Sequence, residues 1–260
     1  MSKIEVRREG HVFLIGLNRP EKYNALDPET YFGLAAAYGE LHNDPDLRCG
    51  VLYANGKHFT TGLELDKFSG NFSKGKRAGF PDGSIDFLGM DEVRRVSKPI
   101  VVAIQGSCYT VGIEIVLACD IRIAADNAKF HQIEVQRGIF PVGGSTVRMF
   151  QEIGWGNAMR YILTGDPMTA EEAYRMGMVQ EVVPLGQQVD KAVEIAQRIA
   201  KQAPLGVQAA LHSSRYARTY GIQPALDRLY LDIMPIMNSE DAAEGVKSFL
   251  EKREAVYKGK

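Results

Sequence analysis

The sequence predicts an α/β fold that continues into a helical C-terminal part. Short runs rich in β-branched residues alternate with helix-like stretches through the first half of the chain, a pattern typical of buried strands covered by helices. From Thr169 onward the strand patterns fade and helical patterns dominate. The chain has 260 residues, of which 45% are hydrophobic and 24% charged, so it can bury a core without disulfides or metals.

Four segments of the first half have the composition of buried strands. They cover residues 12–20, 50–56, 99–106 and 120–126. A further segment, 69–86, is rich in glycine, lysine and serine and has no periodicity. We therefore expect a mobile surface loop over 69–86.

Two helices are predicted between these strand segments. Asp27 precedes a proline at Pro28, which predicts an N-cap and a helix that ends at Asp44. A second helix should begin near Gly112 and lead into the strand at 120–126.

Charge and composition exclude several classes of protein. The formal net charge of −1 and the pI near 6.5 give no overall attraction to nucleic acid or to an anionic membrane. No secretory signal or membrane-spanning run is present, so we expect a cytoplasmic protein. The five histidines show no metal-ligand spacing. The three cysteines lie in or beside apolar runs without CxxC spacing, which predicts reduced core thiols at Cys49, Cys108 and Cys119.

Two strand-to-loop segments have features of a binding site. Residues 55–65 follow a strand and turn at Gly62, a residue type that can direct the next backbone N–H inward. Residues 105–114 leave a buried strand through glycines and enter a helix with a glutamate in its first turn. The N-terminus of a helix offers unpaired N–H groups and a positive dipole, which can stabilise an oxyanion or bind a phosphate.

Two glutamates each have two interpretations. Glu114 lies within an apolar run, where an unpaired carboxylate is costly to bury, so it is either a functional acid or a partner for its own helix N-terminus. Glu134 lies in a strand-like run that ends in a Pro and Gly turn. It is either a second functional acid or an exposed strand residue.

Together these segments resemble the crotonase (enoyl-CoA hydratase/isomerase) superfamily over nearly the whole chain. The likeness is carried, in order, by LNRPEKYNAL, HFTTGLEL, KPIVVAIQG, the Gly-x-Glu helix start, ACDIRIAAD, AKFHQIEVQRGIFP, LTGDPMTAEEAYRMGMVQEVVP and the basic tail KREAVYKGK. The resemblance implies repeated ββα units that form a superhelical core over residues 1–195. It also implies a helical oligomerisation region over residues 196–260, used in trimerisation, and hence a homotrimer or homohexamer.

The resemblance further implies a site for an acyl-CoA thioester. Its carbonyl oxygen would lie between the backbone N–H groups of Leu63 and Val111, which form an oxyanion hole. Glu114 and Glu134 match the two glutamates with which hydratases hold a water, so addition of water to an α,β-unsaturated acyl-CoA is the expected reaction. We assign water activation to Glu114 and proton transfer at the α-carbon to Glu134. No metal or redox cofactor is expected, because CoA enters with the substrate.

Eleven positions are expected to surround the substrate and its CoA group. They are Lys22, Ala25, Leu26, Lys57, Thr61, Gly62, Glu64, Leu65, Gly112, Pro141 and Val142. Lys22, Lys57 and the Lys258 region of a neighbouring subunit are either CoA phosphate ligands or ordinary solvated lysines.

The chain departs from the family pattern at three places. Glu64 replaces a usual aspartate, Thr110-Val111-Gly112 replaces a glycine triplet, and Val142 replaces a frequent glycine. A backbone donor works with any side chain, so Val111 changes the pocket wall without removing the N–H group. Two alternatives stay open: an isomerase or other acyl-CoA lyase that uses Glu134 alone, and a non-catalytic acyl-CoA-binding protein.

Overall fold

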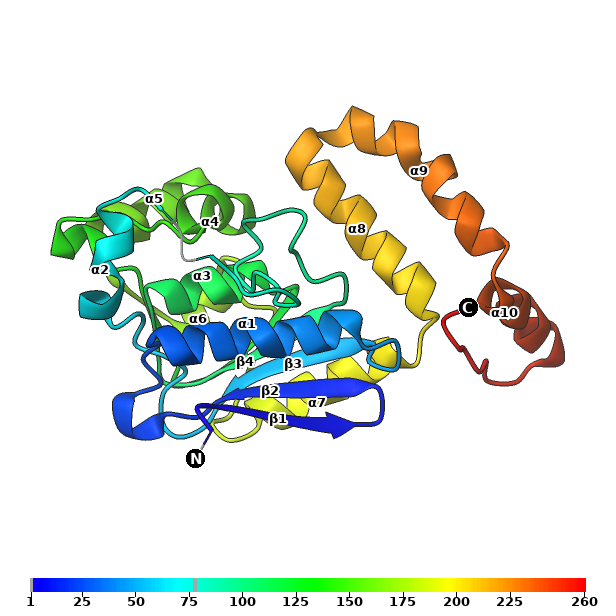
Figure 1. Cartoon of the computed structure of the whole chain (residues 1–260), viewed down its shortest axis with the longest axis horizontal. Coiled ribbons are helices and arrows are strands. Elements are labelled where there is room, and N and C mark those ends of the chain that lie inside the picture. The colour runs from blue at the N-terminus through cyan, green and yellow to red at the C-terminus, as the bar shows by residue number, and fades with distance from the viewer. Residues whose placement is uncertain (1, 77–78) are drawn as a thin grey trace.

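A six-stranded sheet forms the centre of the protein, in a computed structural model that describes residues 2–76 and 79–260 (Figure 1). Its strands, in spatial order, are β1 (Ile4–Glu9), β2 (Val12–Leu17), β3 (Cys49–Ala54), β4 (Ile100–Ile104), β6 (Ile121–Ala125) and β9 (Glu181–Val183). β1 and β2 are antiparallel, whereas every other pair in this sheet is parallel. The carboxyl ends of β2, β3 and β4 therefore meet at one edge of the sheet.

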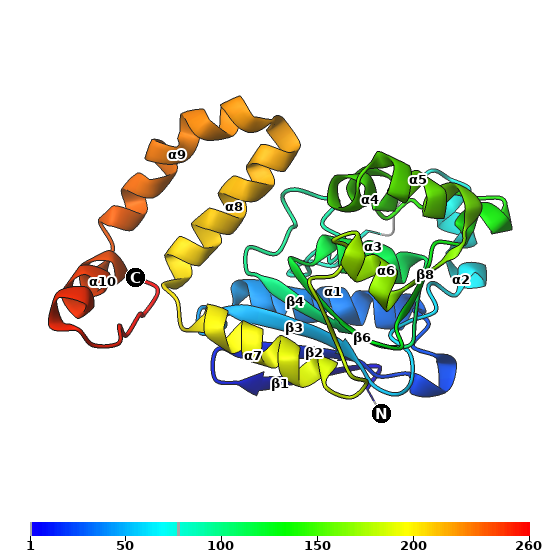
Figure 2. The ribbon, with the colours of Figure 1, turned by 180° about the vertical axis from the view of Figure 1, so that it is seen from behind.

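Helices cover both faces of this sheet (Figures 1 and 2). The helical segments before the last four helices are η1 (Pro20–Lys22), α1 (Pro28–Asn43), α2 (Leu65–Phe72), α3 (Val111–Ala118), η2 (Glu134–Arg137), α4 (Ser145–Ile153), α5 (Trp155–Thr164) and α6 (Ala170–Arg175). On one face, buried side chains of β2, β3 and β4 pack with those of α1 and α3. On the other face they pack against the alanines of α7 (Gln188–Ala200). Burial on both faces explains why the strands read as continuous apolar runs.

A smaller, three-stranded sheet lies beside the central sheet. It consists of β5 (Ser107–Tyr109), β7 (Lys129–His131) and β8 (Pro167–Thr169). The turn from β4 into β5 passes through Gly106, whose φ is +55° and where a Cβ atom would lie 2.1 Å from the carbonyl oxygen of Lys57. Only glycine fits this turn, which places the end of β5 beside the loop that follows β3.

Most of the elements predicted from the sequence are confirmed. Each of the four predicted strand segments contains a strand, and α3 begins within one residue of its predicted start at Gly112. The α1 helix begins at Pro28, and Asp27 caps it by accepting a hydrogen bond from the Thr30 N–H at 2.9 Å. The three cysteines are free and buried.

Three local predictions were wrong. Glu134 lies in the 3-10 helix η2 and not in a strand, because the chain turns directly after β7. The short strand β9 lies beyond Thr169, where helical patterns were expected to dominate, and it extends the sheet by pairing with β6. The segment predicted as a loop over 69–86 begins inside α2, and its residues 77–78 lie outside the described residues.

The last three helices project away from the core (Figures 1 and 2). They are α8 (Pro204–Tyr220), α9 (Ile222–Met237) and α10 (Glu240–Glu251). The division predicted at residue 195 falls inside α7, which packs on the sheet. Across residues 2–76 and 79–260, no helix is long and apolar enough to cross a membrane.

Candidate active site

The two segments singled out from the sequence lie side by side at the end of the sheet. The Thr60 N–H donates to the carbonyl oxygen of Ser107, and the Tyr109 N–H donates to the carbonyl oxygen of Thr60, both at 3.0 Å. On the opposite side of the loop, the Leu26 N–H donates to the carbonyl oxygen of Gly62 at 2.8 Å. The loop 60–64 is thus held between the turn after β2 and strand β5, which leads into α3.

Glycines let these segments approach closely. Gly62 has a φ of +105°, and a Cβ atom there would lie 2.0 Å from Thr110 Oγ1. A Cβ atom on Gly112 would lie 2.6 Å from Thr60 Cγ2. A larger residue at either position would force the threonine that it meets, or the segment that carries this threonine, to shift.

Two backbone N–H groups at this junction lack a partner. Leu63 follows Gly62, and Val111 is the first residue of α3. Within the described part of the chain, neither N–H donates to an acceptor. The first N–H groups of a helix have no intrahelical acceptor, so the Val111 N–H is available to a ligand.

Thr110, the residue before Val111, has an unusual backbone conformation. Thr110 has a φ of +50° and a ψ of −118°, a region that is costly for a β-branched residue. Its N–H donates to the carbonyl oxygen of His131 at 3.0 Å, and its own carbonyl accepts from Ile113 at 2.9 Å. Because the ψ of Thr110 sets the plane of the next peptide, this strained conformation determines where the Val111 N–H points.

Glu114 is buried on α3 and bound at the N-terminus of another helix. Only 3% of the residue is exposed, and its Oε1 accepts from the Gly143 N–H at 2.6 Å and the Ser145 N–H at 3.3 Å. A Cβ atom on Gly143 would lie 2.3 Å from Glu114 Oε2. The carboxylate is therefore held by the start of α4 and does not serve its own helix.

Glu134 is also buried, with 8% of the residue exposed. Its Oε1 accepts from Gln132 Nε2 at 2.8 Å. Gln132 Oε1 in turn accepts from the Ser145 hydroxyl at 3.0 Å. Ser145 thus contacts Glu114 through its N–H and Glu134 through Gln132, and Glu134 Oε2 has no hydrogen-bond partner among the described residues.

Burial raises the pKa of both carboxyl groups, and the charge of Glu134 contributes to the shift of Glu114. The pKa of Glu114 is raised to about 7, mainly by burial and also by the charge of Glu134, while the N–H groups of Ser145 and Gly143 oppose the shift. Burial also raises the pKa of Glu134, against the lowering effect of its hydrogen bonds. Two interacting carboxyl groups in a dry site share a single proton near neutral pH. The arrangement can therefore supply one acid and one base together.

Comparisons with known proteins identify the family of this chain. The family model described as enoyl-CoA hydratase/isomerase matches residues 7–260. The chain belongs to the enoyl-CoA hydratase/isomerase family. An enoyl-CoA hydratase of Mycobacterium tuberculosis is 36% identical over 95% of this chain and 93% of its own length, and a carnitinyl-CoA dehydratase of Salmonella enteritidis is 31% identical over 99% and 98%.

Solved structures show the same fold. A probable enoyl-CoA hydratase/isomerase from Mycobacterium abscessus has a TM-score of 0.95 and 46% identity, with 99% of each chain covered. An enoyl-CoA hydratase from Mycobacterium tuberculosis has a TM-score of 0.90 and 28% identity, with both chains fully covered. The predicted crotonase fold with a helical C-terminal part is confirmed.

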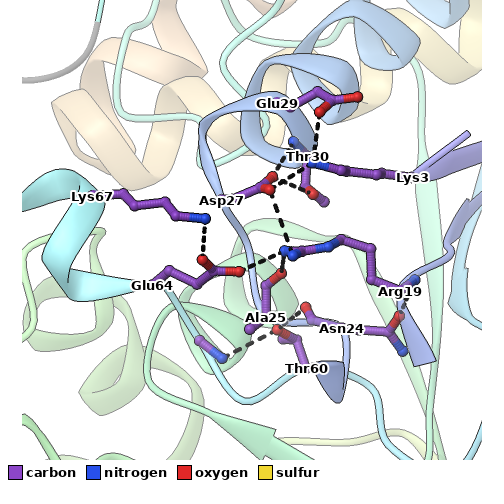
Figure 3. A network of polar contacts seen from close by, with 11 residues as sticks. Lys3, Arg19, Asn24, Ala25, Asp27, Glu29, Thr30, Thr60, Glu64 and Lys67 are labelled. Carbon is purple, nitrogen blue, oxygen red and sulfur yellow. Dashed lines mark hydrogen bonds and ion pairs between the residues drawn. The ribbon is translucent and has the colours of Figure 1, made fainter. Parts of the chain in front are cut away.

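A network of hydrogen bonds and ion pairs joins the turn after β2 to the loop after β3 (Figure 3). Arg19 Nη1 donates to the carbonyl oxygen of Ala25 at 2.6 Å and to Glu64 Oε1 at 2.8 Å, and Glu64 also pairs with Lys67. Arg19 further lies 3.5 Å from Asp27 Oδ2. The Glu64 carboxylate, expected at the substrate, thus joins the turn after β2 to the loop after β3.

The other positions expected around the substrate differ in exposure. Leu26, Gly62, Gly112 and Pro141 are buried, Ala25 and Thr61 are half-buried, and Lys22, Lys57, Leu65 and Val142 are exposed. Neither Lys22 nor Lys57 forms an ion pair within residues 2–76 and 79–260. Lys258 is exposed, and its N–H donates to Asp241 of the same chain's α10 at 2.7 Å.

Sequence reasoning missed three residues that hold the glutamates: Gln132, Gly143 and Ser145. A Gly-Gly-Ser turn before a periodic run is a helix start suited to an anion, and this signal could have identified Gly143 and Ser145. No comparable signal marks Gln132, because its contact with Ser145 depends on the tertiary fold.

The raised pKa of Glu114 predicts a specific pH dependence of stability. Between the ordinary value of 4.5 and the folded value of about 7, the folded state binds more protons than the unfolded state, so the free energy of unfolding falls as pH rises. Glu114→Gln removes this titration, and its stability relative to the wild type should increase across that interval by on the order of 3 kcal/mol. Urea unfolding at fixed protein concentration from pH 4.5 to 8 measures the difference. A stability difference that is independent of pH would contradict the assignment.

Proposed function

We propose that this family member is a hydro-lyase that adds water to the double bond of an α,β-unsaturated acyl-CoA. The observation that carries the proposal is the buried pair of Glu114 and Glu134, joined through Ser145 and Gln132. A second carboxyl group is what hydration requires beyond a simple double-bond shift, since one group deprotonates water while the other protonates carbon. The names of the mycobacterial hydratase and the Salmonella dehydratase support the same class of reaction.

The thioester carbonyl would bind between the unpaired N–H groups of Leu63 and Val111. As the hydroxyl group adds to the β-carbon, negative charge develops on this oxygen, and donors that are already in position stabilise it. Each such donor contributes about 3 kcal/mol in comparable oxyanion holes. The Gly62 turn and the Thr110 conformation hold these two donors in place.

Glu114 and Glu134 share one proton, and the number of protons on the pair is the same before and after the reaction. In the protonation state that reacts, the shared proton is on Glu134: Glu114 accepts a proton from water while the water oxygen bonds to the β-carbon, and Glu134 delivers its proton to the α-carbon. The pair ends with one proton, as it began, once that proton returns to Glu134. The unpartnered Glu134 Oε2 supports its assignment as the atom that faces the substrate.

The proposed reaction needs no cofactor beyond the substrate's CoA group, because the carboxyl pair and the backbone donors supply the chemistry. Lys22 and Lys57 are exposed beside the turns that flank the site, which supports a role in binding the CoA phosphates. Buried free thiols support a location in the reducing cytoplasm.

A panel of enoyl-CoA thioesters tests the function. We expect loss of the conjugated enone absorbance together with formation of the 3-hydroxyacyl product for at least one chain. Movement of the double bond without water uptake would instead indicate an isomerase. Binding of acyl-CoA with neither reaction would indicate a non-catalytic acyl-CoA-binding protein.

We also propose that the C-terminal helices assemble the protein into a homotrimer or homohexamer. Large apolar side chains are exposed along α9 and α10: Ile222, Leu226, Tyr230, Leu231, Met234, Met237, Val246, Phe249 and Leu250. An apolar surface of this extent on a soluble chain marks an interface. Light scattering at micromolar concentration should give three or six times the monomer mass of 28.8 kDa, and a monomer mass would contradict the proposal.

A further inference from the structure

A cavity outside the proposed active site is lined by cationic and polar side chains. It lies between residues 92–97 and α8 and has a volume of about 150 Å³. This exceeds the roughly 30 Å³ that one water molecule occupies in the liquid, so the cavity has room for a group of several atoms. Its lining includes Arg95 and Arg215, together with Gln208, His212 and Tyr216. All five side chains can donate hydrogen bonds.

In the described part of the chain, no carboxylate contacts the partly buried guanidinium group of Arg95. No hydrogen bond or ion pair of its guanidinium exists within the described ranges 2–76 and 79–260. The pKa of Arg95 is lowered to about 10, mainly by burial and also by the charges of Arg215 and Arg148, while the charge of Asp120 opposes the shift. A desolvated charge is costly unless a counter-charge compensates it.

Within the described residues, two of the three guanidinium nitrogens of Arg215 form hydrogen bonds, and the third has no partner. Its Nη1 donates to the carbonyl oxygen of Val96 at 2.5 Å, and its Nη2 donates to Asp120 at 2.9 Å. Its Nε is buried and has no partner among the described residues. The ion pair with Asp120 therefore anchors the Arg215 guanidinium in the cavity wall.

The charges around the cavity add up to an excess of positive charge. Among the described residues, Arg148 donates to the carbonyl oxygens of Leu88 and Gly89 and feels the charge of Asp86, and Arg218 shares Glu152 with Arg122. Glu92 is the single carboxylate among the described lining residues, and its Oε2 accepts from the Tyr220 hydroxyl at 2.6 Å. The guanidinium groups thus outnumber the carboxylates that pair with them.

We propose that this cavity is a binding site for a small oxyanion, a carboxylate or phosphate group, with Arg95 as its main ligand and the positive charge of Arg215 beside it. A guanidinium group matches the planar or tetrahedral oxygens of these anions. Two sources have this chemistry: a free anion, or an anionic group at the far end of an acyl chain bound in the active site. The second source rests on the proposed function, since it requires an acyl thioester.

The test compares wild type, Arg95→Gln and the control Arg198→Gln, which changes an exposed arginine on α7. Sodium phosphate is titrated against sodium chloride at equal ionic strength, and calorimetry gives the melting temperature. We expect a saturable rise in wild type and the control, and at least a tenfold weaker apparent affinity in Arg95→Gln. Because a bound anion stabilises the folded state by mass action, this readout requires no catalytic activity.

Without phosphate, Arg95→Gln should melt no lower than wild type, since the change removes an uncompensated cation. Phosphate bound at the CoA site would stabilise wild type and Arg95→Gln alike, and that result would overturn the proposal. A melting temperature of Arg95→Gln that is low without phosphate and does not respond to it would show a purely structural arginine, which also overturns it.

Thioesters distinguish the two sources. If the acyl end supplies the anion, Arg95→Gln should lower kcat/KM at least tenfold for an enoyl-CoA with a terminal carboxylate but not for an uncharged chain of equal length. If the anion is free, phosphate should stabilise the protein without competing with either substrate. Absence of hydration with any thioester would refute the proposed function while the phosphate titration still tests the cavity.

Discussion

Replacing Glu134 with glutamine is expected to lower kcat for hydration by about 10²- to 10⁴-fold, the usual contribution of a general acid or base. Glutamine retains the size of the side chain and the hydrogen bond to Gln132, but it cannot deliver a proton. Acyl-CoA affinity should change little, because the carboxyl group acts on the reacting atoms and not on the CoA group. Stopped-flow measurement of the enone absorbance, together with acyl-CoA titration, separates the two effects.

Glu114→Gln should cause a loss of similar size, and the double variant should lose far less than the product of the single losses. Residues that act as one unit are not additive. Glu172→Gln is the matched control, since this glutamate closes the capping box of α6, a role that glutamine can also fill. If Glu114→Gln hydrates the best substrate as fast as wild type, the two-glutamate mechanism is wrong and an isomerase takes its place.

Gly62→Ala should lower kcat/KM by about 10²- to 10³-fold, comparable to the loss of an oxyanion-hole donor. The new methyl group would lie 2.0 Å from Thr110 Oγ1, so the loop that carries Leu63 must move away from the residue that orients the Val111 N–H. The distance between the two donors then no longer suits one oxygen atom. Steady-state kinetics with the best enoyl-CoA measures the loss.

Gly186→Ala controls for the cost of backbone strain. Gly186 has a φ of +97°, close to the +105° of Gly62, but a Cβ atom there would meet nothing within 4 Å. Both variants should lose stability, whereas only Gly62→Ala should lose activity beyond its loss of folded protein. Equal kcat/KM for the two variants at matched folded fractions would show that Leu63 is not an oxyanion donor.

Much of the fold was predictable because its signals are local. Strands buried on both faces appear as apolar runs, and Asp27 before Pro28 marks the start of α1. The order of the motifs identified the family, which the comparisons confirm. The assignments of Leu63, Val111 and the two glutamates to chemical roles stay predictions that the proposed variants test.

The sequence by itself determined which residues are available to the site: a glycine turn, a helix start and two glutamates near apolar runs. Only the tertiary structure decided how they are held. Glu114 lies 29 residues from Gly143, whose N–H binds it, and the Glu64 carboxylate pairs with Arg19, 45 residues away. Periodicity reports which face of an element is buried, but a hydrogen bond between distant segments depends on how the elements pack. The same reason applies to Arg95 and Arg215, which share a cavity only because α8 packs against residues 92–97.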